Sequence, residues 1–217
     1  MRYGILLLLV HCLIWLPAIQ SADQFIGQEE LSRLKNSYSE QAHRRGLTLN
    51  KLVNNLQGAD VQLQIQEINR FFNQFQYRED IDQWNEKDYW MTPEEFLGTQ
   101  QGDCEDFVIA KYFALRKLGV PDKRLYLTYV KALKQNVAHM VLSYFETPGS
   151  IPQILDNYNP QILKGNDRKD LLPVYSFNAE SLFLTNASAG LGRSLPTDKI
   201  KNSKWKKLLA EIRKEKQ

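Results

Sequence analysis

Three side chains in the sequence have the types that nucleophilic catalysis needs: Cys104, His139 and Asp156. A thiolate can attack a carbonyl carbon, an imidazole can take the thiol proton and later protonate the leaving amine, and a carboxylate can orient the imidazole. The three residues lie far apart along the chain, so the hypothesis of a triad depends on elements that bring them together. Two ordinary alternatives stay open: Cys104 as a small buried apolar group and His139 as a strand-end histidine.

The N-terminal segment explains why Cys104 stands alone. Arg2 precedes an apolar run from Gly4 to Leu16, and small and polar residues follow, which is the layout of a secretory signal peptide. The run is shorter than the roughly 20 apolar residues that span a bilayer, so we expect no stable membrane insertion once residues 1–22 are cleaved. Cleavage would also remove Cys12. A lone thiol in a compartment that permits disulfides then favours a chemical role for Cys104.

A helix is predicted to carry Cys104 in its first turn. Thr92 and Glu95 form a capping-box pattern that opens a short helix ending at Gly98, and a second helix follows a linker. Apolar residues recur at helical spacing from Phe107 to Leu118, before a stop of Gly, Val and Pro. The N-terminal end of a helix favours a thiolate, and we expect Gly102 to let a substrate approach the backbone.

Acidic residues beside Cys104 oppose that effect. Asp103, Glu105 and Asp106 suit a helix start, but their charges would raise the pKa of a neighbouring thiol. A hard divalent cation bound by carboxylate oxygens would neutralise them, and outside the cytoplasm calcium is the natural candidate. The alternative is that Asp103 is an N-cap and the other two are exposed acids. A further acidic stretch, residues 79–88, does not match an EF-hand loop, and we assign it no role.

The residues after the helix have the alternation of strands. The predicted strands are Leu125–Val130, His139–Phe145, Ile154–Asp156, Tyr175–Asn178 and Leu182–Leu184. A buried helix against an antiparallel sheet is an α+β architecture. Of the two histidines outside the signal peptide, His43 and His139, only His139 heads a strand that a sheet could present to Cys104. Asp156 ends the next strand, where it could accept a hydrogen bond from the imidazole.

The basic excess of the chain, 28 Lys and Arg against 25 Asp and Glu, is concentrated after Asp198. Within that tail the apolar residues recur at helical spacing, which predicts an amphipathic helix docked on the core with a solvated basic face. The apolar residues are Trp205, Leu208, Leu209 and Ile212. We expect no nucleic-acid binding, because no aromatic and basic constellation supports it elsewhere.

Several motifs together resemble the bacterial transglutaminase-like cysteine proteinases of the LapG type. The motifs are Tyr89–Pro93, Gly102–Phe107, Ala110–Tyr112, His139–Leu142, Ile154–Asn157 and Leu172–Asn178. The resemblance covers roughly residues 84–184 and implies a papain/transglutaminase-like core over residues 79–197. It leaves residues 23–78 as an N-terminal helical lobe and residues 198–217 as the C-terminal helix.

The resemblance also implies a function. Family members are periplasmic endopeptidases that cut a large surface adhesin near its N-terminus at a di-alanine site, which releases the adhesin and disperses biofilm. Cys104, His139 and Asp156 fall on the triad positions of the family. Asp103 and Glu105 match its calcium-binding acids, with Asp106 a further candidate. Members are held inactive by the periplasmic domain of an inner-membrane receptor for cyclic di-GMP, which makes such a receptor the expected partner.

Two other classes of function share these residues. A transglutaminase would resolve the acyl-enzyme with an amine instead of water, and the sequence does not separate the two reactions. A catalytically silent module would only bind calcium or a partner, and would keep its biological function in a Cys104→Ala variant. The products formed from an adhesin fragment, cleaved or cross-linked, discriminate these readings.

Overall fold

The computed structural model describes residues 25–179, 181–186, 190–195 and 203–215. The predicted signal peptide, residues 1–22, and the first residues of the predicted C-terminal segment lie outside this range. Within the described residues, no helix has both the length and the apolar character needed to cross a membrane.

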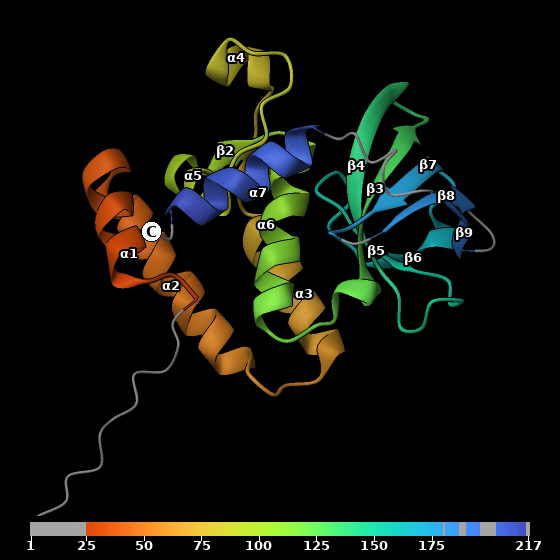
Figure 1. Cartoon of the computed structure of the whole chain (residues 1–217), viewed down its shortest axis with the longest axis horizontal. Coiled ribbons are helices and arrows are strands. Elements are labelled where there is room, and N and C mark those ends of the chain that lie inside the picture. Colours follow the sequence, from red (N-terminus) through yellow and green to blue (C-terminus); the bar gives the residue numbers. More distant parts are fainter. Residues whose placement is uncertain (1–24, 180, 187–189, 196–202, 216–217) are drawn as a thin grey trace, which may run out of the picture.

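Helices make up the first part of the described structure, from residue 28 to residue 72 (Figure 1). The elements are α1 (Gln28–Arg33), the π-helix η1 (Leu34–Tyr38), α2 (Glu40–Leu56) and α3 (Val61–Phe72). Side-chain caps begin the two long helices: Ser39 accepts a hydrogen bond from the N–H of Ala42, and Asp60 accepts one from the N–H of Gln62. One apolar face of each helix is buried, so this helical region packs against the rest of the chain.

A short helix and strand lead to the helix that carries Cys104. Helix α5 (Pro93–Thr99) has the predicted capping box but ends one residue beyond Gly98, where Gln100 adopts the left-handed conformation with φ of 58°. Gly98 is needed for another reason, because a Cβ atom there would lie 2.5 Å from the ring of Tyr38. Strand β2 (Gln101–Gly102) replaces the predicted linker and pairs in parallel with β1 (Gln76–Tyr77). The short helix α4 (Asp80–Trp84) lies between β1 and α5.

The second half of the chain forms a seven-stranded antiparallel sheet in the order β6-β5-β4-β3-β7-β8-β9. Its strands are β3 (Leu125–Ala132), β4 (Val137–Tyr144), β5 (Gln153–Leu155), β6 (Leu163–Lys164), β7 (Leu171–Phe177), β8 (Leu182–Asn186) and β9 (Gly190–Leu195). Each predicted strand is present, whereas β6 and β9 were not predicted. Short 3₁₀ turns, η2 (Asp122–Arg124) and η3 (Gly165–Asp167), precede β3 and follow β6.

Helix α6 (Cys104–Lys117) lies between the N-terminal helices and the sheet (Figure 1). Buried side chains of α6 join those of α2, α3 and α5 and those of β3 and β4 in one apolar cluster. The helix is therefore buried on most of its surface, which fixes the position of its N-terminal end. The structure confirms the α+β architecture, a central helix against an antiparallel sheet with a helical region before it.

Helix α7 (Ser203–Glu215) docks on this core as the apolar spacing predicted. The indole of Trp205 is buried and stacks on Phe113, with ring centroids 6.0 Å apart. It also makes edge contacts with Tyr112 and Phe177. Because these partners come from α6 and β7, α7 ties the central helix to the sheet.

Candidate active site

Cys104 is the first residue of α6, and an acidic cap precedes it. Asp103 accepts a hydrogen bond from the N–H of Glu105, and Asp106 accepts one from the N–H of Asp103 at 3.0 Å. The local sequence therefore forms a capping box, which starts the helix at the cysteine. Cys104 is 7% exposed, and its thiol donates a hydrogen bond to Oε2 of Glu105 at 2.8 Å.

The surroundings of the sulfur disfavour its charged form when the carboxylates are uncompensated. Burial, followed by the negative charges of Glu105 and Asp103, raises the pKa of the Cys104 thiol well above its ordinary value. A hydrogen bond from the backbone N–H of Met140 acts in the opposite direction. This contact also places the sulfur beside β4, because Met140 follows His139 in that strand.

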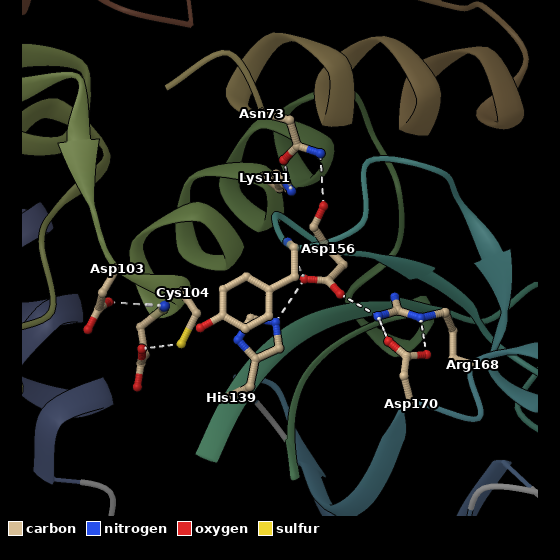
Figure 2. Close-up of polar contacts among 10 residues, drawn as sticks. Asn73, Asp103, Cys104, Lys111, His139, Asp156, Arg168 and Asp170 are labelled. Carbon is tan, nitrogen blue, oxygen red and sulfur yellow. Dashed lines mark hydrogen bonds and ion pairs between the residues drawn. The ribbon is translucent and has the colours of Figure 1, made fainter. Parts of the chain in front are cut away.

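His139 lies on β4, beside Cys104, and is almost completely buried (Figure 2). Its Nε2 atom lies 2.8 Å from Oδ1 of Asp156. Its Nδ1 atom is buried, has no hydrogen-bond partner among the described residues, and lies on the edge of the ring that faces Cys104. An imidazole held at one nitrogen by a carboxylate leaves its other nitrogen free to exchange a proton with a nearby thiol.

Asp156 follows β5 directly, at the end of the strand that the sequence predicted. Its Oδ1 atom also accepts the N–H of Tyr158 at 2.9 Å, and its Oδ2 atom accepts a hydrogen bond from Arg168 at 2.7 Å. Burial alone would raise the pKa of Asp156, but the contacts with His139, Tyr158 and Arg168 outweigh it and hold the pKa below its ordinary value. Asp156 is thus stabilised as a carboxylate facing His139.

Arg168 is a site residue that sequence reasoning missed. It lies in the loop between β6 and β7, and its guanidinium bridges Asp156 and the more exposed Asp170. In the sequence it belongs to a short charged run, Asp167 to Asp170, that is typical of a solvated loop. Nothing local indicates that its side chain turns inward, because its partner Asp156 comes from another loop.

The ring of Tyr158 covers His139. The two rings are stacked, with centroids 4.0 Å apart and planes 8° from parallel, and Tyr77 contacts Tyr158 edge to face. An aromatic ring on the imidazole keeps water from the hydrogen bond between His139 and Asp156, which strengthens that bond. Tyr158 was also not predicted, since its place depends on the turn that Asp156 begins.

The acidic residues near Cys104 form a cluster that includes Asp80, a residue of the stretch 79–88 to which no role was assigned from the sequence. Oxygens of Asp80, Asp103 and Asp106 lie within 4.8 Å of one another, and Asp103 and Glu105 form a second such group with the Cys104 sulfur. Burial is the largest cause of the raised pKa values of the three aspartates, and the negative charge of Glu105 adds to it in each case. Asp80 Oδ1 is buried without a hydrogen-bond partner. Clustered carboxylate oxygens of this kind suit a hard divalent cation.

Asp106 of this cluster has a structural role as well. Both oxygens of Asp106 accept backbone N–H groups, from Met91 and Asp103, so this residue is a cap besides being a member of the cluster. Gly102 was expected only to let a substrate approach the backbone, but it also makes room for Asp106. A Cβ atom at Gly102 would lie 2.4 Å from Oδ2 of Asp106, so glycine is required to admit the capping carboxylate.

Comparisons with known proteins identify the family of this chain. The family model of the bacterial transglutaminase-like cysteine proteinases matches residues 40–170. LapG from Legionella pneumophila is 40% identical, over 87% of this chain and 99% of that one, with a TM-score of 0.72. Its EGTA-treated form gives 40% identity and a TM-score of 0.74, and its calcium-bound form 41% and 0.72, the latter over 85% of this chain and 98% of that one. No curated protein matches. The chain belongs to the bacterial transglutaminase-like cysteine proteinase family.

Proposed function

We propose that this protein is a calcium-dependent cysteine endopeptidase in which Cys104 is the nucleophile, His139 the general base and acid, and Asp156 the residue that orients the imidazole. The observation that carries the proposal is the placement of His139. One ring nitrogen is bound to Asp156 at 2.8 Å, and the other is buried, unpartnered and turned toward Cys104 at the start of α6 (Figure 2).

The reaction follows from these positions. Nδ1 of His139 takes the proton of the thiol, and the sulfur of Cys104 attacks the carbonyl carbon of the scissile peptide. The N–H of Cys104, at the first position of α6, has no partner within the helix and is the first donor for the oxyanion. The imidazolium then protonates the leaving amine, which leaves an acyl-enzyme. Water, deprotonated by His139, hydrolyses the thioester and restores the thiol.

We assign calcium to the acidic cluster. Asp80, Asp103 and Glu105 would hold the ion, and Asp106 would contribute if its oxygens kept their backbone contacts. The fit is supported by the unpartnered oxygen of Asp80 and by the burial of mutually repelling carboxylates beside the thiol. Bound calcium would supply positive charge that offsets the acidic residues that now raise the pKa of Cys104. The calcium-bound form of Legionella LapG adds support from a relative.

The location, substrate and regulation are further parts of the proposal. The signal-peptide pattern supports export to the periplasm. The motifs shared with LapG-type proteinases, and the 40% identity to Legionella LapG, support a large surface adhesin as the substrate, cut near its N-terminus at a di-alanine site. The same likeness supports inhibition by the periplasmic domain of a cyclic di-GMP receptor. Cleavage would release the adhesin and disperse biofilm.

A single incubation tests the proposal. Purified protein is mixed with the N-terminal portion of a candidate adhesin in calcium or in EGTA, and the products are mapped by mass. We expect two fragments in calcium and an intact chain in EGTA or with Cys104→Ala. Cross-linked products would indicate a transglutaminase. Cleavage by Cys104→Ala would reject the assignment of the nucleophile.

A further inference from the structure

A buried amine on α6 is connected to Asp156 through one intermediate side chain (Figure 2). Lys111 is 0% exposed, and its Nζ donates a hydrogen bond to Oδ1 of Asn73 at 2.7 Å. Asn73, the C-cap of α3, donates through Nδ2 to the backbone carbonyl of Asp156 at 2.8 Å. The two bonds link three segments that are distant in sequence: α6, the end of α3 and the loop after β5.

The place of Lys111 on α6 gives this connection its meaning. Lys111 is seven residues after Cys104, which is about two turns of an α-helix, so both side chains project from the same face. Helix α6 therefore carries the nucleophile at its first residue. Two turns later, on the same face, it carries the amine that connects to the Asp156 loop through Asn73. These two hydrogen bonds therefore tie the backbone of Asp156 to the helix that carries Cys104.

Burying an amine at this position lowers the stability of the fold, so we expect it to have a role that an apolar side chain could not fill. Removing a charged or polar amine from water is unfavourable, and a methionine would fill similar space in the core without that cost. Burial lowers the pKa of Lys111 to about 7, with the negative charge of Asp156 acting in the opposite direction. The amine of Lys111 thus interacts electrostatically with Asp156. It also binds the amide of Asn73, which in turn binds the backbone carbonyl of Asp156.

We infer that Lys111 and Asn73 are positioning residues for the reaction, which hold the backbone of Asp156 so that its carboxylate meets His139 at the correct distance from Cys104. The inference rests on the proposed triad. Neither side chain touches the reacting atoms, and both act through Asp156. Loss of either bond lets the loop move relative to α6, and a shift of about 1 Å in such a group is enough to lower turnover roughly 100-fold.

The chain offers a matched control for Asn73 on the same helix. Asn69, one turn earlier on α3, donates through Nδ2 to the carbonyl of Pro160 at 3.0 Å, in the same loop but away from Asp156. Asn73→Ala and Asn69→Ala therefore each remove one amide that bonds this loop. Asn73→Asp keeps an oxygen for Lys111, removes the donor to Asp156 and adds a negative charge that the amine of Lys111 can pair with. Lys111→Met removes the amine and keeps much of the packed stem.

The deciding readout is the downfield ¹H resonance of the His139 ring N–H that is bonded to Asp156, recorded on full-length mature protein labelled with ¹⁵N and assigned with a His43→Gln variant. We expect the resonance in the wild type and in Asn69→Ala, and its loss or clear upfield shift in Asn73→Ala, Asn73→Asp and Lys111→Met. An unchanged resonance in Asn73→Asp, or none in the wild type, would overturn the inference.

Cleavage of the adhesin fragment gives the second readout. We expect kcat to fall roughly 10- to 100-fold in Asn73→Asp with KM changed less than about twofold, and Asn69→Ala to keep wild-type kcat. Equal losses in Asn73→Ala and Asn69→Ala would reduce both residues to structural contacts and overturn the inference. The resonance does not depend on activity, so a protein that shows the expected spectra but cleaves nothing would reject the proposed function and not the positioning role.

Discussion

Arg168→Met tests whether the carboxylate beside His139 depends on the guanidinium that holds it. Nη2 of Arg168 lies 2.7 Å from Oδ2 of Asp156, and the side chains are 2% and 0% exposed. Methionine keeps an unbranched apolar stem but removes the charge. Loss of one partner from a buried ion pair costs about 3–5 kcal/mol, because the remaining charge is left uncompensated. Asp156 keeps its bonds to His139 and Tyr158, so we expect a loss near the lower figure, about 3 kcal/mol.

Asp170→Asn is the control for this experiment, because it changes the other acid that binds the same guanidinium. Asp170 is 33% exposed, and ion pairs open to solvent contribute about 0.2–1 kcal/mol. Urea unfolding followed by tryptophan fluorescence gives the free energy of unfolding of each variant. Arg168→Met should also lower the cleavage rate, whereas Asp170→Asn should leave it near the wild-type rate. Equal stability losses in the two variants would refute the reasoning that burial makes the Asp156 pair the important one.

Three further predictions concern the acidic cluster and the docked helix. Gly102→Ala should cost about 1–3 kcal/mol by overpacking against Asp106 and should weaken calcium binding, measured by urea unfolding and calorimetry. Burial raises the Asp80 pKa from 3.8 to about 6, so protons compete with calcium for this carboxylate between about pH 4 and pH 6. The rise in Tm that calcium causes should therefore grow as the pH increases from about 4 to about 6. A rise in Tm that does not depend on pH would contradict the assignment of Asp80 as a calcium ligand. Trp205→Ala should lower the free energy of unfolding by about 3–5 kcal/mol, because the buried indole packs against α6 and β7; a loss under about 1 kcal/mol would show that α7 is not docked in solution.

The parts of the site that could be predicted from sequence are those set by local patterns. The capping acids and the apolar spacing after Phe107 place Cys104 at the start of a helix, and strand alternation places His139 and Asp156 on neighbouring strands. Strand pairing then brings the two together, since β4 pairs with β5 and Leu142 lies opposite Leu155. Local chemistry and simple topology were therefore sufficient for these three residues.

The parts that could not be predicted depend on contacts between distant segments. Asp80 reaches the acidic cluster only because β1 pairs with β2, a ladder of two residues on each strand that carries no recognisable pattern. Arg168 approaches Asp156 from the loop between β6 and β7, and Asn73 approaches it from the C-terminal end of α3. From the sequence alone, Lys111 would be expected to be an ordinary solvated lysine. Only the packing of α3 on α6 shows that it is buried. Short strands and inward-turned polar side chains leave little trace in a single sequence.

The central claim is that Cys104 and His139 act as one unit in the reaction. The most direct test compares the rates at which Cys104→Ala, His139→Ala and the double variant cleave the adhesin fragment in calcium. Residues that act together in one step give non-additive losses. We expect each single variant to lose at least about three orders of magnitude in rate and the double variant to lose no more than the single ones. Losses that add in free energy, or substantial cleavage by Cys104→Ala, would contradict the account.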